Sequence, residues 1–158
     1  MTVKSNIKWK NFLVNIAIPL AVGGISALIT GEGFRDYQNV TQPPLSPPAW
    51  LFPVVWTILY VLMGVSSYLI WEKGKDERNR PLTVYAVQLF LNFLWPVFFF
   101  MLKAYLFAFI WLILLWAFVL ATVILFYRAN KTAGLLQIPY ILWLTFAAYL
   151  NLGVYLLN

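Results

Sequence analysis

Five long runs of apolar residues, separated by short polar segments, dominate the pattern along the chain. They extend over residues 11–30, 51–71, 82–102, 105–127 and 133–157. A helix needs about 20 residues to cross a hydrocarbon core of about 30 Å, because each residue advances it by about 1.5 Å. Every run is long enough. The pattern therefore predicts an all-α fold, an integral membrane bundle of five transmembrane helices in a single domain, residues 1–158.

The composition supports a membrane protein and excludes several kinds of chemistry. Apolar residues make up 63% of the 158 residues and charged residues only 10%, more apolar surface than a soluble domain of this size buries. The sequence has no cysteine and no histidine. Disulfides, thiol nucleophiles, imidazole acid–base chemistry and zinc sites are therefore excluded, and we expect no metal and no required cofactor.

The basic residues are distributed unevenly between the two ends of the predicted helices. Nine of the eleven lie before the first helix, in the 72–81 connector or in the 128–132 connector; only Arg35 and Lys103 lie at the other end. Positive residues gather on the cytoplasmic side of membranes. We therefore predict a cytoplasmic amino terminus, which includes Lys4, Lys8 and Lys10, and an external carboxyl terminus. Charges confined to short connectors form no basic face, so the net charge of +6 does not indicate nucleic-acid binding.

The first apolar run predicts a retained helix rather than a cleaved signal, since it exceeds the usual signal core. The connector after it, GEGFRDYQNVTQPPLSPPAW at residues 31–50, contains four prolines within six positions. Proline removes a backbone donor and favours extended structure in the residue before it, so this connector is expected to be non-helical. Two interpretations remain: a rigid surface spacer, or a lid over the external mouth of the bundle.

Ion-coupled transport is not favoured by the pattern. No ionisable side chain other than tyrosine lies well inside a predicted helix, although pumps and channels generally place such groups along their path. Five helices also do not divide into two equal inverted repeats.

Most tryptophans and tyrosines near the helix ends suit anchoring at the membrane interfaces. Trp95 and Trp143 are different, because both lie deep within a predicted helix. A buried indole N–H requires a partner, and deep polar side chains usually point into a bundle. These two positions are therefore candidates for an internal site.

Helical spacing predicts three faces that combine aromatic, amide and small residues. The first carries Trp56, Tyr60 and Gly64, the second Gln88, Asn92, Trp95 and Phe99, and the third Trp143, Ala147 and Asn151. Their convergence would form an aromatic pocket; the alternative is that they are ordinary helix contacts. Pro96, in the middle of the third helix, predicts a kink that would help to open a cavity.

Several motifs resemble the TspO/MBR family of tryptophan-rich sensory and translocator proteins, the peripheral-type benzodiazepine receptors. Pro47-Pro48-Ala49-Trp50 and the run from Phe52 to Tyr60 resemble its signature. Further matches follow in order, and the resemblance covers most of the chain. They are Gln88-Leu89, Leu91-Asn92, Trp95, Ile138-Pro139-Tyr140, Trp143, Phe146-Ala147 and Leu150-Asn151.

This resemblance implies five helices around a pocket that is capped by the first loop and binds porphyrins. It implies sterols or benzodiazepine-site compounds as ligands of some members, membrane lipid as the surroundings, and a homodimer as the assembly. The residues that would line the pocket are Trp56, Tyr60, Asn92, Trp95, Trp143, Ala147 and Leu150. Those that would shape the lid are Tyr37, Pro47, Pro48 and Trp50.

The chain departs from the family pattern in the first loop. Asp36-Tyr37 stands where the family often has Trp-Tyr, and Gln42-Pro43 where it often has Lys-Pro. Arg35 is then the only basic residue of the loop that could pair with a porphyrin carboxylate. The proposed cholesterol pattern is also incomplete, since no Lys or Arg follows Tyr155.

Three functions are compatible with these observations. The first is a receptor or sensor that encloses a porphyrin or a similar flat apolar ligand between aromatic side chains. The second is passive translocation of tetrapyrroles or sterols. The third is light- and oxygen-dependent degradation of protoporphyrin, with Trp56 and Trp143 as the candidate reactive residues; no nucleophile–base pair suited to ordinary hydrolysis is apparent.

Overall fold

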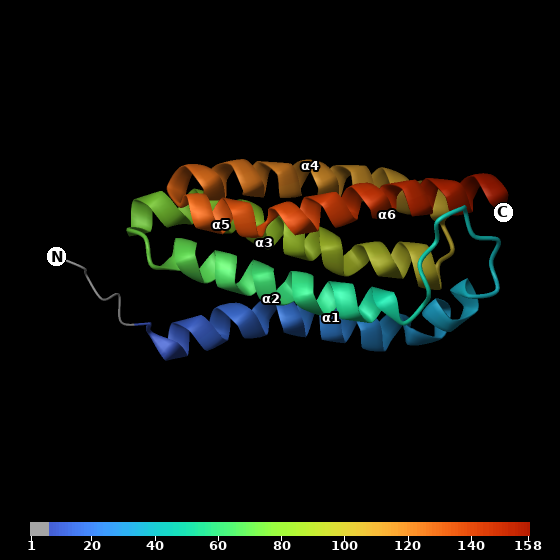
Figure 1. Cartoon of the computed structure of the whole chain (residues 1–158), viewed down its shortest axis with the longest axis horizontal. Helices are drawn as coiled ribbons and strands as arrows, with labels where there is room; N and C mark the ends of the chain where they lie inside the picture. Colours follow the sequence, from blue (N-terminus) through green and yellow to red (C-terminus); the bar gives the residue numbers. More distant parts are fainter. Residues whose placement is uncertain (1–6) are drawn as a thin grey trace.

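The structure is a computed structural model that describes residues 7–158; Met1–Asn6, and with them Lys4, lie outside the described residues. All secondary structure in the described part is helical, and the helices run side by side along the long axis (Figure 1). The elements are α1 (Trp9–Tyr37), α2 (Leu51–Trp71), α3 (Lys75–Pro96), the π-helix η1 (Val97–Met101), α4 (Tyr105–Ala129), α5 (Lys131–Leu136) and α6 (Ile138–Leu157). The prediction of an all-α bundle is confirmed.

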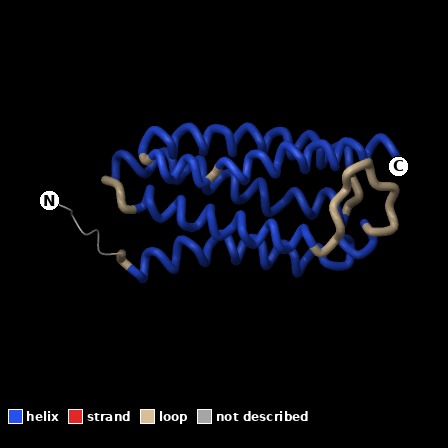
Figure 2. Tube along the Cα trace, in the orientation of Figure 1, coloured by secondary structure: helices blue, strands red, loops and turns tan. Residues whose placement is uncertain are grey.

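Two pairs of these elements follow one another along the chain, η1 after α3 and α6 after α5, and each pair is counted here as one rod. Within the described residues, five rods are then long and apolar enough to span a membrane. Figure 2 shows the non-helical segments mainly at the two ends of the bundle. Helix α1 packs mainly on α2, α3 on α4, and α4 on α6, while α5 lies against α2 and α4. Gly64 permits the close approach of α1, because a Cβ at this position would overlap the backbone of Asn15 and Ile16.

The first and third helices are longer than the apolar pattern indicated. Helix α1 continues from residue 30 to Tyr37, so the expectation of a non-helical connector from residue 31 is wrong for its first seven residues. This stretch contains no proline, and its aromatic residues Phe34 and Tyr37 pack against Phe100. Helix α3 begins at Lys75 rather than at residue 82: Asp76 and Glu77 suit the positive end of the helix dipole in the first turn, and Pro81, the seventh residue, lies inside the helix.

Two breaks in the helices coincide with prolines. After Pro96 the chain continues as η1, in which the Leu102 N–H donates to the Val97 carbonyl at 3.0 Å. The Val97 N–H donates to the Leu94 carbonyl, and the Phe93 carbonyl accepts a hydrogen bond from the Ser26 hydroxyl of α1 at 3.2 Å. The rod predicted at residues 133–157 is divided by a turn at Gln137, just before Pro139 in the first turn of α6.

The proline-rich loop, residues 38–50, is hydrogen-bonded to the carboxyl-terminal half of α6. The Thr41 N–H donates to the Asn158 side chain at 3.1 Å, and the Asn158 amide donates to the Thr41 carbonyl at 2.9 Å. The Tyr149 hydroxyl donates to the Pro44 carbonyl at 2.7 Å. These hydrogen bonds fix the position of the loop against α6. Its predicted role as a lid depends on its position relative to the cavity, described next.

Candidate functional site

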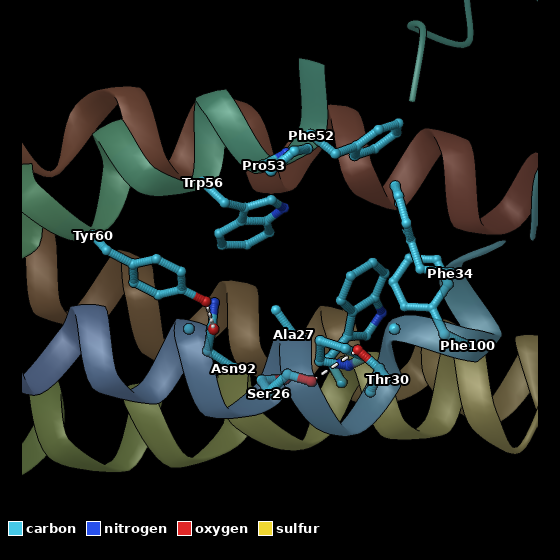
Figure 3. A pocket seen from close by; sticks show the side chains of 14 residues that line it. Ser26, Ala27, Thr30, Phe34, Phe52, Pro53, Trp56, Tyr60, Asn92 and Phe100 are labelled. Atoms are coloured by element: carbon cyan, nitrogen blue, oxygen red, sulfur yellow. Dashed lines mark hydrogen bonds between the residues drawn. The ribbon is translucent and has the colours of Figure 1, made fainter. Parts of the chain in front are cut away.

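A cavity of about 290 Å³ lies between α1, α2 and the junction of α3 with η1 (Figure 3). In Figure 3 the Trp56 and Phe52 side chains extend from α2 on one side, and Ser26, Ala27 and Thr30 from α1 lie opposite. The lining residues are Gly23, Ser26, Ala27, Thr30, Gly31, Phe34, Phe52, Pro53, Trp56, Tyr60, Asn92, Trp95, Pro96 and Phe100.

The cavity exists because small residues of α1 face large aromatic residues of α2 and α3. Gly23, Ala27 and Gly31 recur at helical spacing and carry little or no side chain into the space. Near Gly23 the helices close up, because the Tyr60 ring occupies the position that a Cβ of Gly23 would take. The space therefore ends at Tyr60 and extends from there towards Phe34 and Phe100.

Aromatic rings form the walls of the cavity and pack together at the end opposite Tyr60. Trp56 stacks on Tyr60 with ring centroids 5.6 Å apart and an interplanar angle of 29°. At the far end, Phe34 packs edge-on against Phe52 at 6.1 Å and Phe100 at 5.4 Å. Such walls suit a flat apolar ligand, since an aromatic pair adds about 0.5–1.5 kcal/mol beyond the burial of its area.

A chain of hydrogen bonds forms the inner polar side of the cavity. The Tyr60 hydroxyl donates to Asn92 Oδ1 at 2.7 Å, and Asn92 Nδ2 donates to the Tyr140 hydroxyl at 2.8 Å. The Tyr140 hydroxyl in turn donates to Gln88 Oε1 at 3.0 Å. Most polar hydrogens at the cavity are thus committed to protein partners, and no charged residue lines it. The cavity is suited to a neutral ligand or to the neutral part of one.

The structure brings together four of the seven residues predicted to line a pocket: Trp56, Tyr60, Asn92 and Trp95 line this cavity. Ala147 and Leu150 are buried in α6 but are not among its lining residues. Whether any of the seven contacts a ligand stays a prediction.

Trp143 lies in a different place, an apolar groove of about 400 Å³ between α2 and α6. The groove is lined by Val55, Ile58, Leu59, Pro139, Leu142, Trp143 and Phe146. Phe52 lines the cavity and also packs edge-on against Trp143, with ring centroids 6.0 Å apart. The Trp143 indole therefore reaches the cavity only through Phe52.

The four predicted lid residues divide into two groups. Tyr37 ends α1 and packs against Phe52, Phe99 and Phe100 at the closed end of the cavity. Pro47, Pro48 and Trp50 belong to the loop, and no residue of 38–50 is among those that line the cavity. The lid role of the loop stays a prediction.

Sequence reasoning missed the contribution of α1, which supplies six of the fourteen lining residues. The sequence prediction of the pocket rests on aromatic and amide faces, and residues 16–30 of the first helix include neither kind of residue. The signal was present as small residues at Gly23, Ala27 and Gly31, four positions apart on one face.

Comparison with known proteins gives a consistent result over nearly the whole chain. Residues 15–156 match the family model described as TspO/MBR family. "Tryptophan-rich protein TspO" of Chlorobaculum tepidum is 38% identical over 146 residues, which cover 90% of this chain and 92% of that protein. "Translocator protein" of Ovis aries is 41% identical over 126 residues, 78% of this chain and 75% of that protein. "Tryptophan-rich sensory protein" of Cereibacter sphaeroides is 34% identical over 153 residues, 97% and 94% of the two chains.

Proposed function

This chain belongs to the TspO/MBR family of membrane proteins, and from that premise we propose that it is a receptor or sensor that binds porphyrins and similar flat apolar molecules in the α1–α2–α3 cavity. The observation that carries the proposal is the enclosure of an uncharged space by the Trp56, Trp95 and Phe100 rings. The family and the five apolar rods make the chain a multi-pass integral membrane protein, so such ligands reach it by partitioning into the bilayer.

The size of the cavity limits how a porphyrin would bind. At about 290 Å³ the cavity is at the lower end of the range of about 300–1,000 Å³ that is usual for small-molecule sites. It holds part of a macrocycle, and the rest must extend through an opening. Smaller flat ligands fit within it entirely.

Binding is tested with purified protein by protoporphyrin quenching of tryptophan fluorescence and by absorbance of the bound pigment. We expect Trp56→Ala to weaken binding at least tenfold, or about 1.4 kcal/mol, since Trp56 forms a wall of the cavity. Trp71→Ala serves as the control, because Trp71 is exposed at the other end of α2 beside Arg78. Equal losses in the two variants, or no saturable binding by the parent, would contradict the proposal.

A second candidate function is light- and oxygen-dependent degradation of the bound porphyrin. The position of the Trp56 indole on the cavity wall favours it, since an oxidisable ring there would contact the pigment. The test is illumination of the protein–protoporphyrin complex in air: the candidate predicts faster bleaching than in detergent alone, reduced in Trp56→Phe at matched occupancy. Bleaching of this variant at the parent rate removes Trp56 from the chemistry.

The orientation that we propose places the proline-rich loop outside the cell and the α2–α3 connector in the cytoplasm. Gln38 and Asn79 are exposed at opposite ends of the bundle, and the chain has no native cysteine. In intact cells a membrane-impermeant thiol reagent should therefore label Gln38→Cys and leave Asn79→Cys unlabelled until the cells are opened. The reverse result would invert the topology.

A further inference from the structure

The cavity is open sideways between α1 and α2, on the surface that faces lipid in a membrane. Ala27 of α1 and Pro53 of α2 line the cavity and are also exposed on the outside of the bundle. Gly31, one turn after Ala27, lines the same edge, and a Cβ added there would meet no atom within 4 Å. A ligand dissolved in the bilayer can therefore enter without passing either end of the bundle.

Helix α1 also carries a cation to the outer lip of this opening. Its 29 residues make it about 43 Å long, which exceeds a hydrocarbon core of about 30 Å, so its last turns stand in the headgroup region. Arg35 follows Gly31 by four residues, on the same side of the helix, and is exposed. The other cation at this end, Lys103, is paired with Asp36 at 3.1 Å.

Arg35 has no ion-pair partner within residues 7–158, and the cavity beside it has no charged residue in its lining. Within residues 7–158 the structure records ion pairs for Lys8 and Lys103, and none for Arg35. The cavity itself has no cation, and a carboxylate drawn into it would lose its water without gaining a charged partner. Glu32 is exposed on α1 but does not line the opening. A carboxylate-bearing ligand is thus best accommodated with its acid group outside, at Arg35.

Resting on the proposed function, we infer that the ligand enters from the bilayer between α1 and α2, and that a carboxylate of the bound porphyrin pairs with Arg35 at the edge of this opening. The apolar body then lies between Trp56 and the small residues of α1, and the carboxylate stays in the headgroup region. This arrangement also accounts for the part of a porphyrin that the cavity cannot hold.

The pairing is tested with protoporphyrin and its dimethyl ester, which differ only in the two acid groups, on protein in nanodiscs of uncharged lipid. We expect Arg35→Gln to weaken binding of the diacid about fivefold, the upper range for an exposed ion pair, and to leave the ester unchanged. Arg35→Lys should retain most of the affinity. Arg80→Gln, at the opposite end of the bundle, is the charge-matched control and should change neither ligand.

Equal affinities of the parent and Arg35→Gln for the diacid would overturn the pairing with Arg35. An equal loss for the diacid and the ester would show a structural effect and would also overturn it. If the parent binds neither ligand, the proposed function fails instead, so the two failures are distinguishable.

The route of entry has its own matched pair of variants. Gly31 and Gly24 both have open space at the Cβ position, and only Gly31 lines the cavity. We expect Gly31→Phe to slow the association of the dimethyl ester delivered from vesicles at least tenfold in stopped-flow fluorescence, while Gly24→Phe leaves it unchanged. Unaltered association in Gly31→Phe would overturn sideways entry.

Discussion

The two sides of the bundle are built from the same kinds of residue and packed differently. On the α3–α4–α6 side, two indoles donate to polar atoms of neighbouring helices: Trp95 Nε1 to Asn151 Oδ1 at 3.1 Å and Trp111 Nε1 to the Leu91 carbonyl at 2.8 Å. The Trp143 indole N–H of α6, in the groove towards α2, is buried without a partner among residues 7–158. On the α1–α2 side, aromatic rings face small residues across a cavity. Only five described residues of α1 are buried: Asn15, Pro19, Ser26, Thr30 and Tyr37.

This difference follows from what holds helices together in lipid. An apolar side chain gains little by moving from acyl chains to protein, so association depends on close packing and on hydrogen bonds between helices. The α3–α4–α6 side has both. Helix α1 has close packing near Gly64 and a hydrogen bond from the Ser26 hydroxyl to the Phe93 carbonyl of α3, and between these contacts and its last turns it borders the cavity. The cavity therefore lies beside the apolar helix that has the smallest buried share.

The largest effect is expected where α1 is held most closely. Gly64→Val places atoms on the backbone of Asn15 and Ile16, which cannot move aside as a side chain can. We expect a loss of about 3 kcal/mol in the free energy of unfolding, the upper range for overpacking, together with loss of ligand binding as α1 separates. Gly24→Val is the control, since its Cβ meets nothing within 4 Å. Similar thermal unfolding of the two variants in detergent would refute the tight contact.

The α3–α4–α6 side was more accessible to sequence reasoning than the cavity side. Buried amides and indoles at helical spacing, such as Asn92, Trp95 and Asn151, signal polar pairing because lipid offers no alternative partner. The five membrane-spanning helices were likewise predictable, because each apolar run is long enough to cross the hydrocarbon core of a bilayer.

The cavity could not be predicted from the same pattern. A void depends on the difference between facing side chains, and Gly31 opposite Pro53 is visible only once the two helices are placed side by side. The extension of α1 to Tyr37 was missed for a related reason: polar residues end the apolar run at residue 30, but aromatic packing at Phe34 continues the helix.

The next largest effect tests the hydrogen bonds of the packed side. Asn151 accepts from Trp95 and donates to the Tyr105 carbonyl at 2.8 Å. Asn151→Leu leaves the Trp95 indole without its partner, so we expect the free energy of unfolding to fall by about 2 kcal/mol, as measured by thermal unfolding. Thr145→Val on the same helix removes an exposed acceptor of the Trp116 indole and should cost much less. Equal losses would mean that burial does not strengthen these bonds.

A smaller effect, of opposite sign in two variants, tests the buried glutamines. Gln137 is fully buried, and neither polar atom of its side-chain amide has a hydrogen-bond partner among residues 7–158; Gln88 Oε1 accepts from Tyr140, while Gln88 Nε2 has no partner in the same part of the chain. Because an unpaired buried amide is costly, Gln137→Leu should raise the free energy of unfolding by about 1 kcal/mol. Gln88→Leu should lower it by less than about 1 kcal/mol, since the loss of the acceptor of Tyr140 is partly offset by the removal of an unpaired nitrogen. Destabilisation by Gln137→Leu would show that solvent reaches this amide.

The smallest effect separates the pocket implied by family resemblance from the cavity in the structure. The resemblance places Trp143 in the pocket, whereas the structure places it in the α2–α6 groove, behind Phe52. If the ligand occupies the cavity as it stands, Trp143→Ala should weaken protoporphyrin binding less than threefold, or about 0.6 kcal/mol, compared with at least tenfold for Trp56→Ala. If affinity falls tenfold in Trp143→Ala but is normal in Trp143→Phe, Trp143 acts by supporting Phe52, since a phenyl ring preserves that contact. A tenfold loss in both variants would mean that the indole itself reaches the ligand, and the boundary at Phe52 would have to open on binding.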